Sequence, residues 1–425
     1  MKLTFYINSG LITLNFAASF FLSMFLLIMP AIFTSTSAFQ FILLSILTGL
    51  IGAFIYPLLS YFLVEQLKVE PIYIGVYMVL VTLSGLAISQ YLGRLADQGY
   101  SARKMYILAN SGIILALLVY MNTNLFAVVL LAGVFFMAFG NASVPQMLTL
   151  SRQWTQDKPV DITQFNARIR AGISFAWMIG PPLGFTLVAY IGFTATFSMA
   201  VLVACIGIMF VALCIPEQPA ANKPITNEPP TKAPLSFWFL ALAIVMGSMG
   251  NNMYTSALPL YTINELALPR YTPGVLMGLV AGLEIPIMLW SSRLCQRFSK
   301  THIMLAAFCF GCVFYIGVFN ATTFAVLLAL QVVNALFYGL FAGVGLTLMQ
   351  EQLPARIGFT SAVYSNGFKI GVMVGASCMG VIAQYFSFRY ALLGAAAASA
   401  LGAVFLGLFL NHNACSQCKL SQDAL

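Results

Sequence analysis

The chain has 425 residues, of which 61% are hydrophobic and only 7% are charged, and its mean hydropathy is +0.94. Soluble globular domains are roughly 25% charged, so this composition excludes a soluble protein and predicts an all-α membrane protein. The formal charge of +8 is spread over many loops rather than gathered in one dense cluster, which excludes a nucleic-acid partner.

Twelve apolar stretches recur along the chain, each near the ~20 residues that cross a bilayer as a helix. In chain order they are residues 39–62, 72–92, 105–120, 125–150, 169–191, 193–215, 237–260, 273–290, 303–319, 324–349, 357–383 and 390–410. A proline-rich polar segment, 216–234, separates the sixth stretch from the seventh, and we interpret it as a solvated linker. The chain therefore divides into two six-helix halves, 39–215 and 235–410, followed by a tail, 411–425.

Matched landmarks indicate that the two halves are repeats. Gly75 corresponds to Gly274, 199 residues later, and Gly180 corresponds to Gly375, 195 residues later. Parallel repeats of this size are typical of transporters whose substrate site lies between the halves near the middle of the bilayer.

One further apolar stretch, residues 11–33, lies before the first of the twelve predicted helices. Three interpretations remain open for residues 1–38: an uncleaved signal-like segment, an additional span, or sequence upstream of a translation start at Met29. Because the two halves are equal in length without it, we expect this N-terminal hydrophobic segment to be dispensable.

The distribution of basic residues predicts the orientation. Thirteen of them lie in loops after even-numbered helices or in the linker, whereas loops after odd-numbered helices contain only Lys68, Arg270 and Arg389. Basic loops remain on the cytoplasmic side of a membrane. We therefore expect the linker and the C-terminus to be cytoplasmic.

The loop after the second helix carries a recognisable motif. Its sequence, Gly93-x-Leu95-x-Asp97 followed by Arg103, resembles the loop motif of the major facilitator superfamily. In that family the acid latches the two halves in one state, which implies gating roles for Gly93, Asp97 and Arg103. The alternative is that Arg103 is only a topology anchor.

A glycine-proline run lies in the fifth helix. Gly180, Pro181, Pro182 and Gly184 follow Ala176, a pattern similar to the antiporter motif of the same superfamily. Small residues four apart allow close helix packing, and prolines bend a helix. We expect a kink at which the halves rock, although a packing kink without directional meaning remains open.

Segments near these motifs resemble one particular branch of the superfamily. The runs 144–148, 176–185 and 281–286, together with Arg152 and Arg170, look like those of the sugar efflux transporters, a bacterial branch of the superfamily. The resemblance implies a monomeric twelve-helix major facilitator fold in the inner membrane that exports small sugars or glycosides, such as lactose, in exchange for protons. A multidrug or amino-acid exporter on the same fold remains the alternative. The role of Arg170 is also open between a gate and a substrate contact.

Glu284 is the acid most deeply placed in a predicted helix, nine residues before Arg293 and thus about 14 Å from the cytoplasmic end. An intramembrane carboxylate costs at least ~2.5 kcal/mol, so it should face a wet cavity or a partner. Lys369 lies at similar depth, on a polar stripe with Asn366. Glu284 therefore either carries a coupling proton or binds sugar hydroxyls, or it pairs with Lys369 to hold the second half together.

Neutral polar and aromatic side chains inside the predicted helices supply the remaining substrate candidates, because sugars are bound by amides and aromatic faces. Each can instead form a bond between helices. The candidates are Asn141, Gln146, Trp177, Asn251, Asn252, Tyr254, Asn334, Asn366 and Lys369.

Enzymatic chemistry finds no support in the sequence. The chain has only two histidines, and it contains no phosphate-binding glycine loop and no evident nucleophile with a base. We expect no catalytic residue, no metal and no cofactor.

Overall fold

The structure, a computed structural model, describes residues 38–97, 100–155, 162–215 and 233–422. Within these ranges the chain forms helices without strands, and twelve helices are long and apolar enough to cross a membrane. The predicted twelve-helix, all-α membrane architecture is therefore confirmed. The apolar stretch 11–33 and residues 216–232 of the predicted linker lie outside the described residues.

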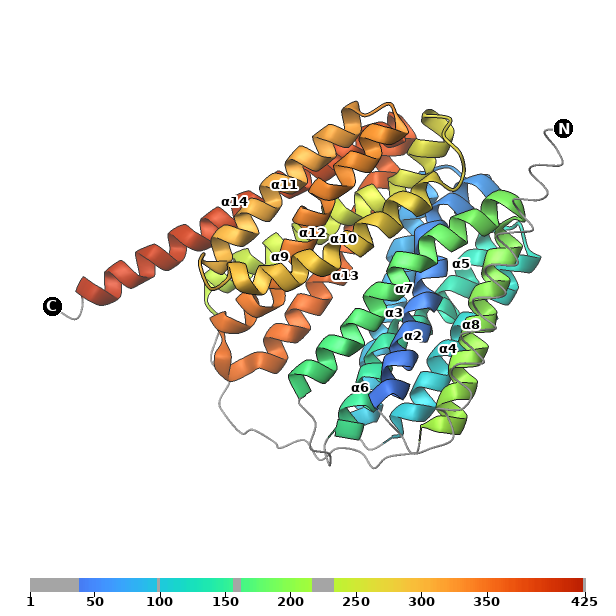
Figure 1. Cartoon of the computed structure of the whole chain (residues 1–425), viewed down its shortest axis with the longest axis horizontal. Coiled ribbons are helices and arrows are strands. Elements are labelled where there is room, and N and C mark those ends of the chain that lie inside the picture. Colours follow the sequence, from blue (N-terminus) through green and yellow to red (C-terminus); the bar gives the residue numbers. More distant parts are fainter. Residues whose placement is uncertain (1–37, 98–99, 156–161, 216–232, 423–425) are drawn as a thin grey trace.

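Figure 1 shows the two halves side by side, the first in blue to green and the second in yellow to red. The first half contains α2 (Ala38–Tyr61), η1 (Phe62–Gln66), α3 (Ile72–Asp97), α4 (Ala102–Asn122), α5 (Phe126–Phe135), η2 (Met137–Ala142), α6 (Ser143–Thr155), α7 (Ile162–Tyr190) and α8 (Phe193–Cys214). The second contains α9 (Leu235–Leu260), η3 (Tyr261–Glu265), α10 (Thr272–Leu294), α11 (Lys300–Asn320), α12 (Phe324–Gln352), η4 (Pro354–Arg356), α13 (Ile357–Tyr385) and α14 (Phe388–Gln422).

The helices of the two halves have matching neighbours. In the first half α2 packs on α7 and α8, and α4 packs on α8; in the second half α9 packs on α13 and α14, and α11 packs on α14. Such matching contacts are the three-dimensional form of the sequence repeat. The last helix, α14, continues beyond the predicted end of its span at residue 410 and ends at Gln422.

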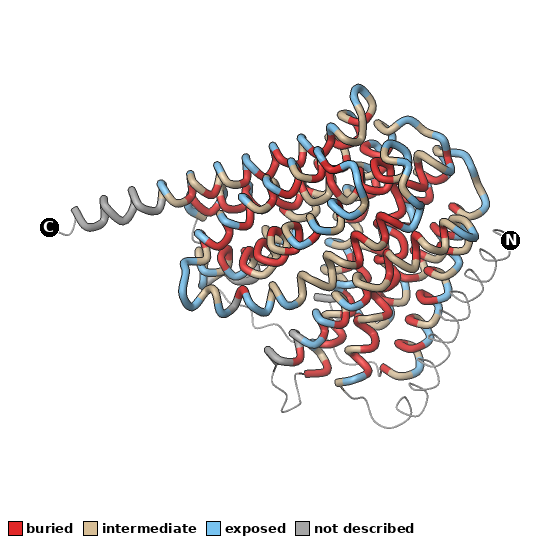
Figure 2. The backbone as a smooth tube through the Cα atoms, turned by 45° about the horizontal axis from the view of Figure 1, so that its top comes forward, coloured by how far each residue is buried: buried red, intermediate tan, exposed pale blue. Residues whose placement is uncertain are grey.

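Small residues set the distance between α2 and α7. Gly49 faces Ala176, so that a Cβ at Gly49 would lie 2.8 Å from the Ala176 methyl, and Gly180 lies against Ala53. Because lipid provides no hydrophobic drive between helices, close contacts of this kind supply most of the association. Figure 2 shows the resulting buried surfaces where helices of one half face one another.

The fourth span is interrupted, unlike the single helix expected over residues 125–150. It consists of α5, the 3-10 segment η2 and α6, whereas its counterpart α12 is one helix. Pro145 has no N–H to donate to the carbonyl of Asn141 four residues earlier, so an α-helical bond is missing at the junction. The interruption places Asn141 in η2.

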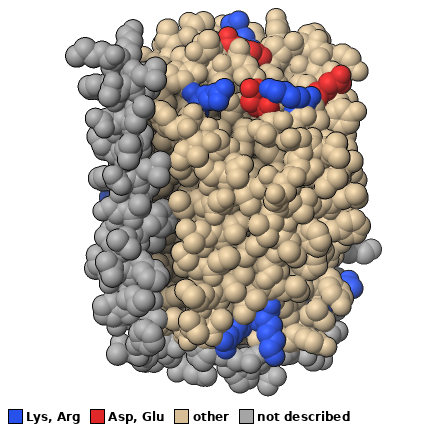
Figure 3. Space-filling view, turned by 90° about the vertical axis from the view of Figure 1, so that its right-hand side faces the viewer, with Lys and Arg blue, Asp and Glu red and all other residues tan. Residues whose placement is uncertain are grey.

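Charged side chains gather at the two ends of the bundle, with an uncharged band between them (Figure 3). One end, here called the mixed-charge end, carries acids and bases together (Figure 3). It is formed by the connections from α2 to α3, from α9 to α10 and from α13 to α14, which contain or adjoin Glu65, Lys68, Glu70, Glu265, Arg270 and Arg389. The other, here called the basic end, carries mostly bases at the opposite ends of these helices and their neighbours, among them Arg94, Arg103, Arg152, Arg293, Lys300 and Arg356. The uncharged band is the surface that lipid covers.

Replacing Gly180 with alanine should destabilise the protein by about 1–3 kcal/mol, because the new methyl overlaps Ala53 in a packed contact. The matched control is Gly407→Ala in α14, where a Cβ meets open space, and this change should be neutral or slightly stabilising. Thermal unfolding in detergent measures both variants. Equal unfolding temperatures for the two would show that α2 and α7 are not closely packed at Gly180.

Candidate functional site

The two halves meet close to the mixed-charge end. Gly274, in the first turn of α10, lies so near α7 that a Cβ there would be 2.6 Å from the Pro181 carbonyl oxygen. Gly75, in the first turn of α3, approaches α13 equally closely, with a Cβ position 2.8 Å from the Cα of Ser377. Since both contacts involve the first turns of their helices, the halves are pressed together on this side of the bilayer.

Pro181 and Pro182 lie inside α7, which continues as one helix from Ile162 to Tyr190. Gly274 and Gly278 of α10 pack against these two prolines. Gly184 accepts a hydrogen bond from Thr196 of α8 (3.1 Å). The glycine-proline run therefore forms part of the interface between the halves.

The polar stripe on α13 faces the other half nearer the basic end. Asn366 precedes Ser377 by eleven residues, and Lys369 precedes Gly380 by eleven. Eleven residues are about three helical turns, so each pair shares one face of α13 at an axial distance of about 16 Å. Ser377 and Gly380 contact α3, so Asn366, which is exposed, and Lys369, which is half-buried, point toward the space between the halves.

Arg170 and Trp177 occupy the corresponding face of α7. Arg170 precedes Pro181 by eleven residues and Trp177 precedes it by four, so both lie on the side that faces the second half. The exposed guanidinium of Arg170 is close enough to Tyr364 of α13 to act on it electrostatically. Side chains from the two halves thus converge on one region.

Glu284 lies half-buried in α10, with its backbone against Gly339 of α12 and its carboxylate within electrostatic range of Tyr338. Among the described residues Glu284 forms neither an ion pair nor a hydrogen bond. In particular, the side chains of Glu284 and Lys369 do not form the ion pair that one interpretation of the sequence required.

An aromatic cluster next to Glu284 completes the site, and sequence reasoning missed it. The ring of Phe368 lies 5.9 Å from that of Tyr364, 6.4 Å from Tyr338 and 6.1 Å from the buried Phe341, measured between centroids. Tyr364 and Phe368 are four residues apart on the helix that carries the polar stripe. That spacing was the available signal, since aromatic faces are a regular component of sugar sites.

The two adjacent amides of α9 point in different directions. Asn252 contacts α13, where a Cβ on Gly375 would lie 3.2 Å from the Asn252 Cβ, and it accepts a hydrogen bond from Ser256 (3.4 Å). Asn251 lies one turn beyond Gly247, which packs on Phe341 of α12. Asn251 is therefore on the α12 side of α9 and Asn252 on the α13 side.

In the first half, Asn141 lies against α3 at Gly85 and donates to the Ala138 carbonyl (3.4 Å). Gly85 is the residue that matches Glu284 at the 199-residue offset, so the two halves differ at this position. Gln146 is only 3% exposed, and its Oε1 lacks a hydrogen-bond partner among the described residues.

Tyr254 and Asn334 are placed away from the space between the halves. Both bond to Oε1 of Gln331 at 3.2 Å, Tyr254 through its hydroxyl and Asn334 through its amide. All three side chains are almost completely buried between α9, α11 and α12. The Tyr254 bond joins α9 to α12 within the second half, whereas the bond between Asn334 and Gln331 lies within α12.

The expected gating residues of the first loop are only partly visible. Gly93 has open space around it, and Asp97 is the last residue of α3, with a side chain outside the described part. Arg103 donates to the Ala212 carbonyl and so ties α4 to α8 within the first half. In the part of the chain that the structure describes, no group of three or more His, Cys, Asp or Glu residues could hold a metal ion.

Comparison with known proteins agrees with this architecture. The sequence profile of the Major Facilitator Superfamily matches residues 41–319 and 240–417. The chain is 33% identical to sugar efflux transporter C of Escherichia coli (strain K12) over 366 residues, which are 85% of this chain and 92% of the relative. It is also 33% identical to sugar efflux transporter A of Dickeya chrysanthemi over 353 residues, 82% and 89% of the two chains.

Solved structures share the fold at low sequence identity. The nucleoside transporter NupG superposes with a TM-score of 0.73 at 15% identity, covering 88% of this chain and 98% of the other. A bacterial homologue of the iron transporter ferroportin in an inward-facing state gives 0.68 at 16% identity, covering 88% and 98%. These likenesses concern the fold alone.

Proposed function

Because the chain belongs to the Major Facilitator Superfamily and, within it, to the sugar efflux transporters, we propose that it exports small sugars or glycosides from a bacterial cell in exchange for protons. Its relatives and its fold are those of membrane transporters and not of enzymes. The basic end faces the cytoplasm in this proposal, since that end carries most of the bases.

One observation supports the proposal: Arg170 of the first half and Glu284 of the second half each lie within electrostatic range of the same aromatic cluster, Arg170 at Tyr364 and Glu284 at Tyr338. Glu284 can accept hydrogen bonds from sugar hydroxyls, Arg170 can donate to sugar oxygens, and Tyr364 and Phe368 offer ring faces to the apolar side of a sugar. Asn366, Lys369, Trp177 and Asn251 extend the same surface. Tyr254 and Asn334 are assigned to packing instead, because both are buried and the Tyr254 hydroxyl and the Asn334 amide nitrogen bond to Gln331, although Oδ1 of Asn334 has no partner among the described residues.

The position of the contacts between the halves supports alternating access as the mechanism. The close approach of α10 to α7 and of α3 to α13 lies at the mixed-charge end, and the candidate site lies up to three turns nearer the basic end. This arrangement supports a state in which the site is reached from the cytoplasm. Rocking of 39–215 against 235–410 about the contact at Gly274 and Pro181 would open the opposite side.

Proton coupling is assigned to Glu284. A carboxylate at membrane depth without an ion-pair partner is costly, and taking up a proton removes its charge. Binding of a proton and binding of a sugar at the same carboxylate then compete, which is the requirement for exchange of one against the other.

A second candidate is export of a lipophilic cation. An unpaired acid beside aromatic rings is also the chemistry that binds a cation of low hydration. The observation in its favour is the electrostatic interaction of Glu284 with Tyr338, which belongs to the aromatic cluster of α12 and α13.

Counterflow in proteoliposomes with an imposed pH gradient separates the two candidates. Vesicles loaded with unlabelled substrate should take up labelled lactose or glucose transiently, because exchange through one site runs faster than net loss. Uptake of labelled tetraphenylphosphonium without uptake of either sugar would replace the sugar proposal with the cation one.

Changing Glu284 to glutamine should abolish proton-driven uphill flux and leave exchange at equal pH partly intact, because the amide keeps the shape of the carboxyl and cannot carry the proton. Glu351→Gln is the matched control, since Glu351 forms a surface ion pair with Lys300 at the basic end. Uphill flux that persists in Glu284→Gln would remove Glu284 from the coupling mechanism.

Asp97 remains the proposed latch of the cytoplasmic side, on the strength of the loop motif. Its replacement by asparagine removes a charge that favours one conformation and should shift the population of states rather than destroy the substrate site. Equilibrium affinity should change modestly while turnover falls. Wild-type turnover in Asp97→Asn would show that the motif does not gate this transporter.

A further inference from the structure

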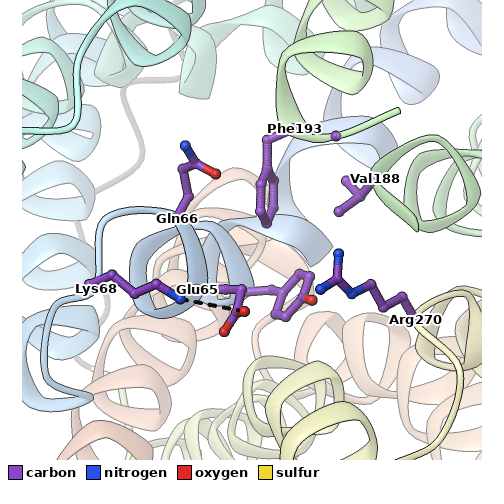
Figure 4. Close-up of a pocket in the computed structure, with 8 residues that line it drawn as sticks. Glu65, Gln66, Lys68, Val188, Phe193 and Arg270 are labelled. Atoms are coloured by element: carbon purple, nitrogen blue, oxygen red, sulfur yellow. Dashed lines mark ion pairs between the residues drawn. The ribbon is translucent and has the colours of Figure 1, made fainter. Parts of the chain in front are cut away.

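A separate cavity of about 410 Å³ opens at the mixed-charge end, distant from Glu284. The first half contributes Tyr61, Glu65, Lys68 and Phe193 to its lining, and the second half contributes Arg270. Figure 4 shows Glu65 of η1 and Arg270, from the turn before α10, on the same side of the cavity, and Lys68 is paired with Glu65 at 3.5 Å. Its size is within the ~300–1,000 Å³ of small-molecule sites.

Tyr61 of α2 lines this cavity. The residue as a whole is 1% exposed, and its hydroxyl forms no hydrogen bond with the other residues that the structure describes. The hydroxyl is therefore free to bond to a molecule in the cavity. The ring of Phe193 lies 5.3 Å from that of Tyr61, measured between centroids, and provides an aromatic face beside the hydroxyl.

The second half fills the equivalent place with its own side chains. The π-helical segments η1 and η3 correspond at the 199-residue offset, since Leu67 bonds to the Phe62 carbonyl as Leu266 bonds to that of Tyr261. There, Glu265 accepts hydrogen bonds from the first amides of α14, Phe388 (2.7 Å) and Arg389 (3.2 Å).

The first half lacks this closing contact. Gln66 stands where Glu265 would be, and its amide donates to Asn124 (3.4 Å). Gly192, the residue before α8, provides no side-chain cap, and the start of α8 lines the cavity. The first half therefore has a cavity at the position that Glu265 and the start of α14 close in the second half.

The charges around the hollow indicate the ligand. Glu65 and Arg270 both act on the Tyr61 hydroxyl, yet the described side chains of Glu65 and Arg270 do not form an ion pair with each other. A group that spans them must donate to a carboxylate and accept from a guanidinium. Sugar hydroxyls do both, and Phe193 and Tyr61 can cover the apolar face of the ring.

We propose that this cavity is a second, weaker sugar-binding site on the outward side of the membrane, formed by Tyr61, Glu65 and Arg270. The inference rests on the proposed function in its choice of sugar. Because the site joins the two halves where they are in contact, a sugar bound there stabilises the state that is closed to the outside. Exported sugar would in this way slow its own further export.

Equilibrium dialysis of purified protein in lipid nanodiscs with radiolabelled lactose tests the assignment. Wild-type protein should bind two lactose molecules per chain. Tyr61→Phe and Arg270→Gln should each weaken one of the two sites about tenfold, the effect of one lost hydrogen bond to a charged or buried group. Tyr61→Phe removes only a hydroxyl without a protein partner, so the variant should fold.

Tyr261→Phe is the matched control. The hydroxyl of Tyr261 donates to the Val318 and Ala321 carbonyls at 3.3 and 2.8 Å, so its loss should lower the unfolding temperature and leave both lactose sites intact.

Three results would overturn the inference. If wild-type protein carries lactose in counterflow but binds only one molecule per chain, the second site is absent and the proposed function stands. If the cavity binds galacturonate and not galactose, it is an anion site. If the protein neither carries nor binds lactose, the proposed function and this inference fail together.

Discussion

The interior of a bilayer offers no hydrogen-bonding partners, and this constraint separates the polar residues of the chain into two kinds. Most form hydrogen bonds inside one half. The Thr48 and Tyr106 hydroxyls, for example, are 2.9 Å apart, and the Ser143 hydroxyl donates to the Asn110 side-chain oxygen at 2.9 Å. These bonds hold helices together. Glu284 belongs to the other kind, because it lies within a membrane-spanning helix, beside α12, without a bonded partner in the described structure. The candidate site is therefore recognised by a carboxylate, that of Glu284, which has no hydrogen-bond or ion-pair partner among the described residues.

The duplication makes the differences between the halves informative. A shared fold places Gly85 and Glu284 at matching positions, but Asn141 covers the glycine in one half, whereas in the other the acid lies within electrostatic range of Tyr338, a member of the aromatic cluster. The same comparison reveals the cavity at the mixed-charge end, since Glu265 caps α14 and no carboxylate of the described first half caps α8. At matching positions, one half can therefore hold a residue that only packs while the other half holds a residue that can bind a ligand.

The two halves approach closely at glycines, because a glycine has no side chain to hold the backbones apart. Gly274 on α10 and Gly75 on α3 bring the backbones of opposite halves together at the mixed-charge end, where a larger residue would hold them apart. Such contacts bury few polar groups, so they can be broken and remade without leaving unsatisfied hydrogen bonds. A transporter that alternates between two states requires an interface of this kind, and the proposed outer sugar site lies beside it.

The sequence by itself determined the membrane class, the twelve helices and the repeat, because hydropathy and residue spacing are local properties that survive without knowledge of contacts. It also selected Glu284, since a charge within an apolar run is conspicuous. Only the tertiary structure decided which polar residues face the site. Tyr254 looked equivalent to Asn251 in sequence, but its partner Gln331 lies on another helix, and the rotation of a helix about its axis is set by packing. The aromatic cluster around Phe368 and the unmatched hydroxyl of Tyr61 likewise depend on residues far apart in the chain, which no local pattern brings together.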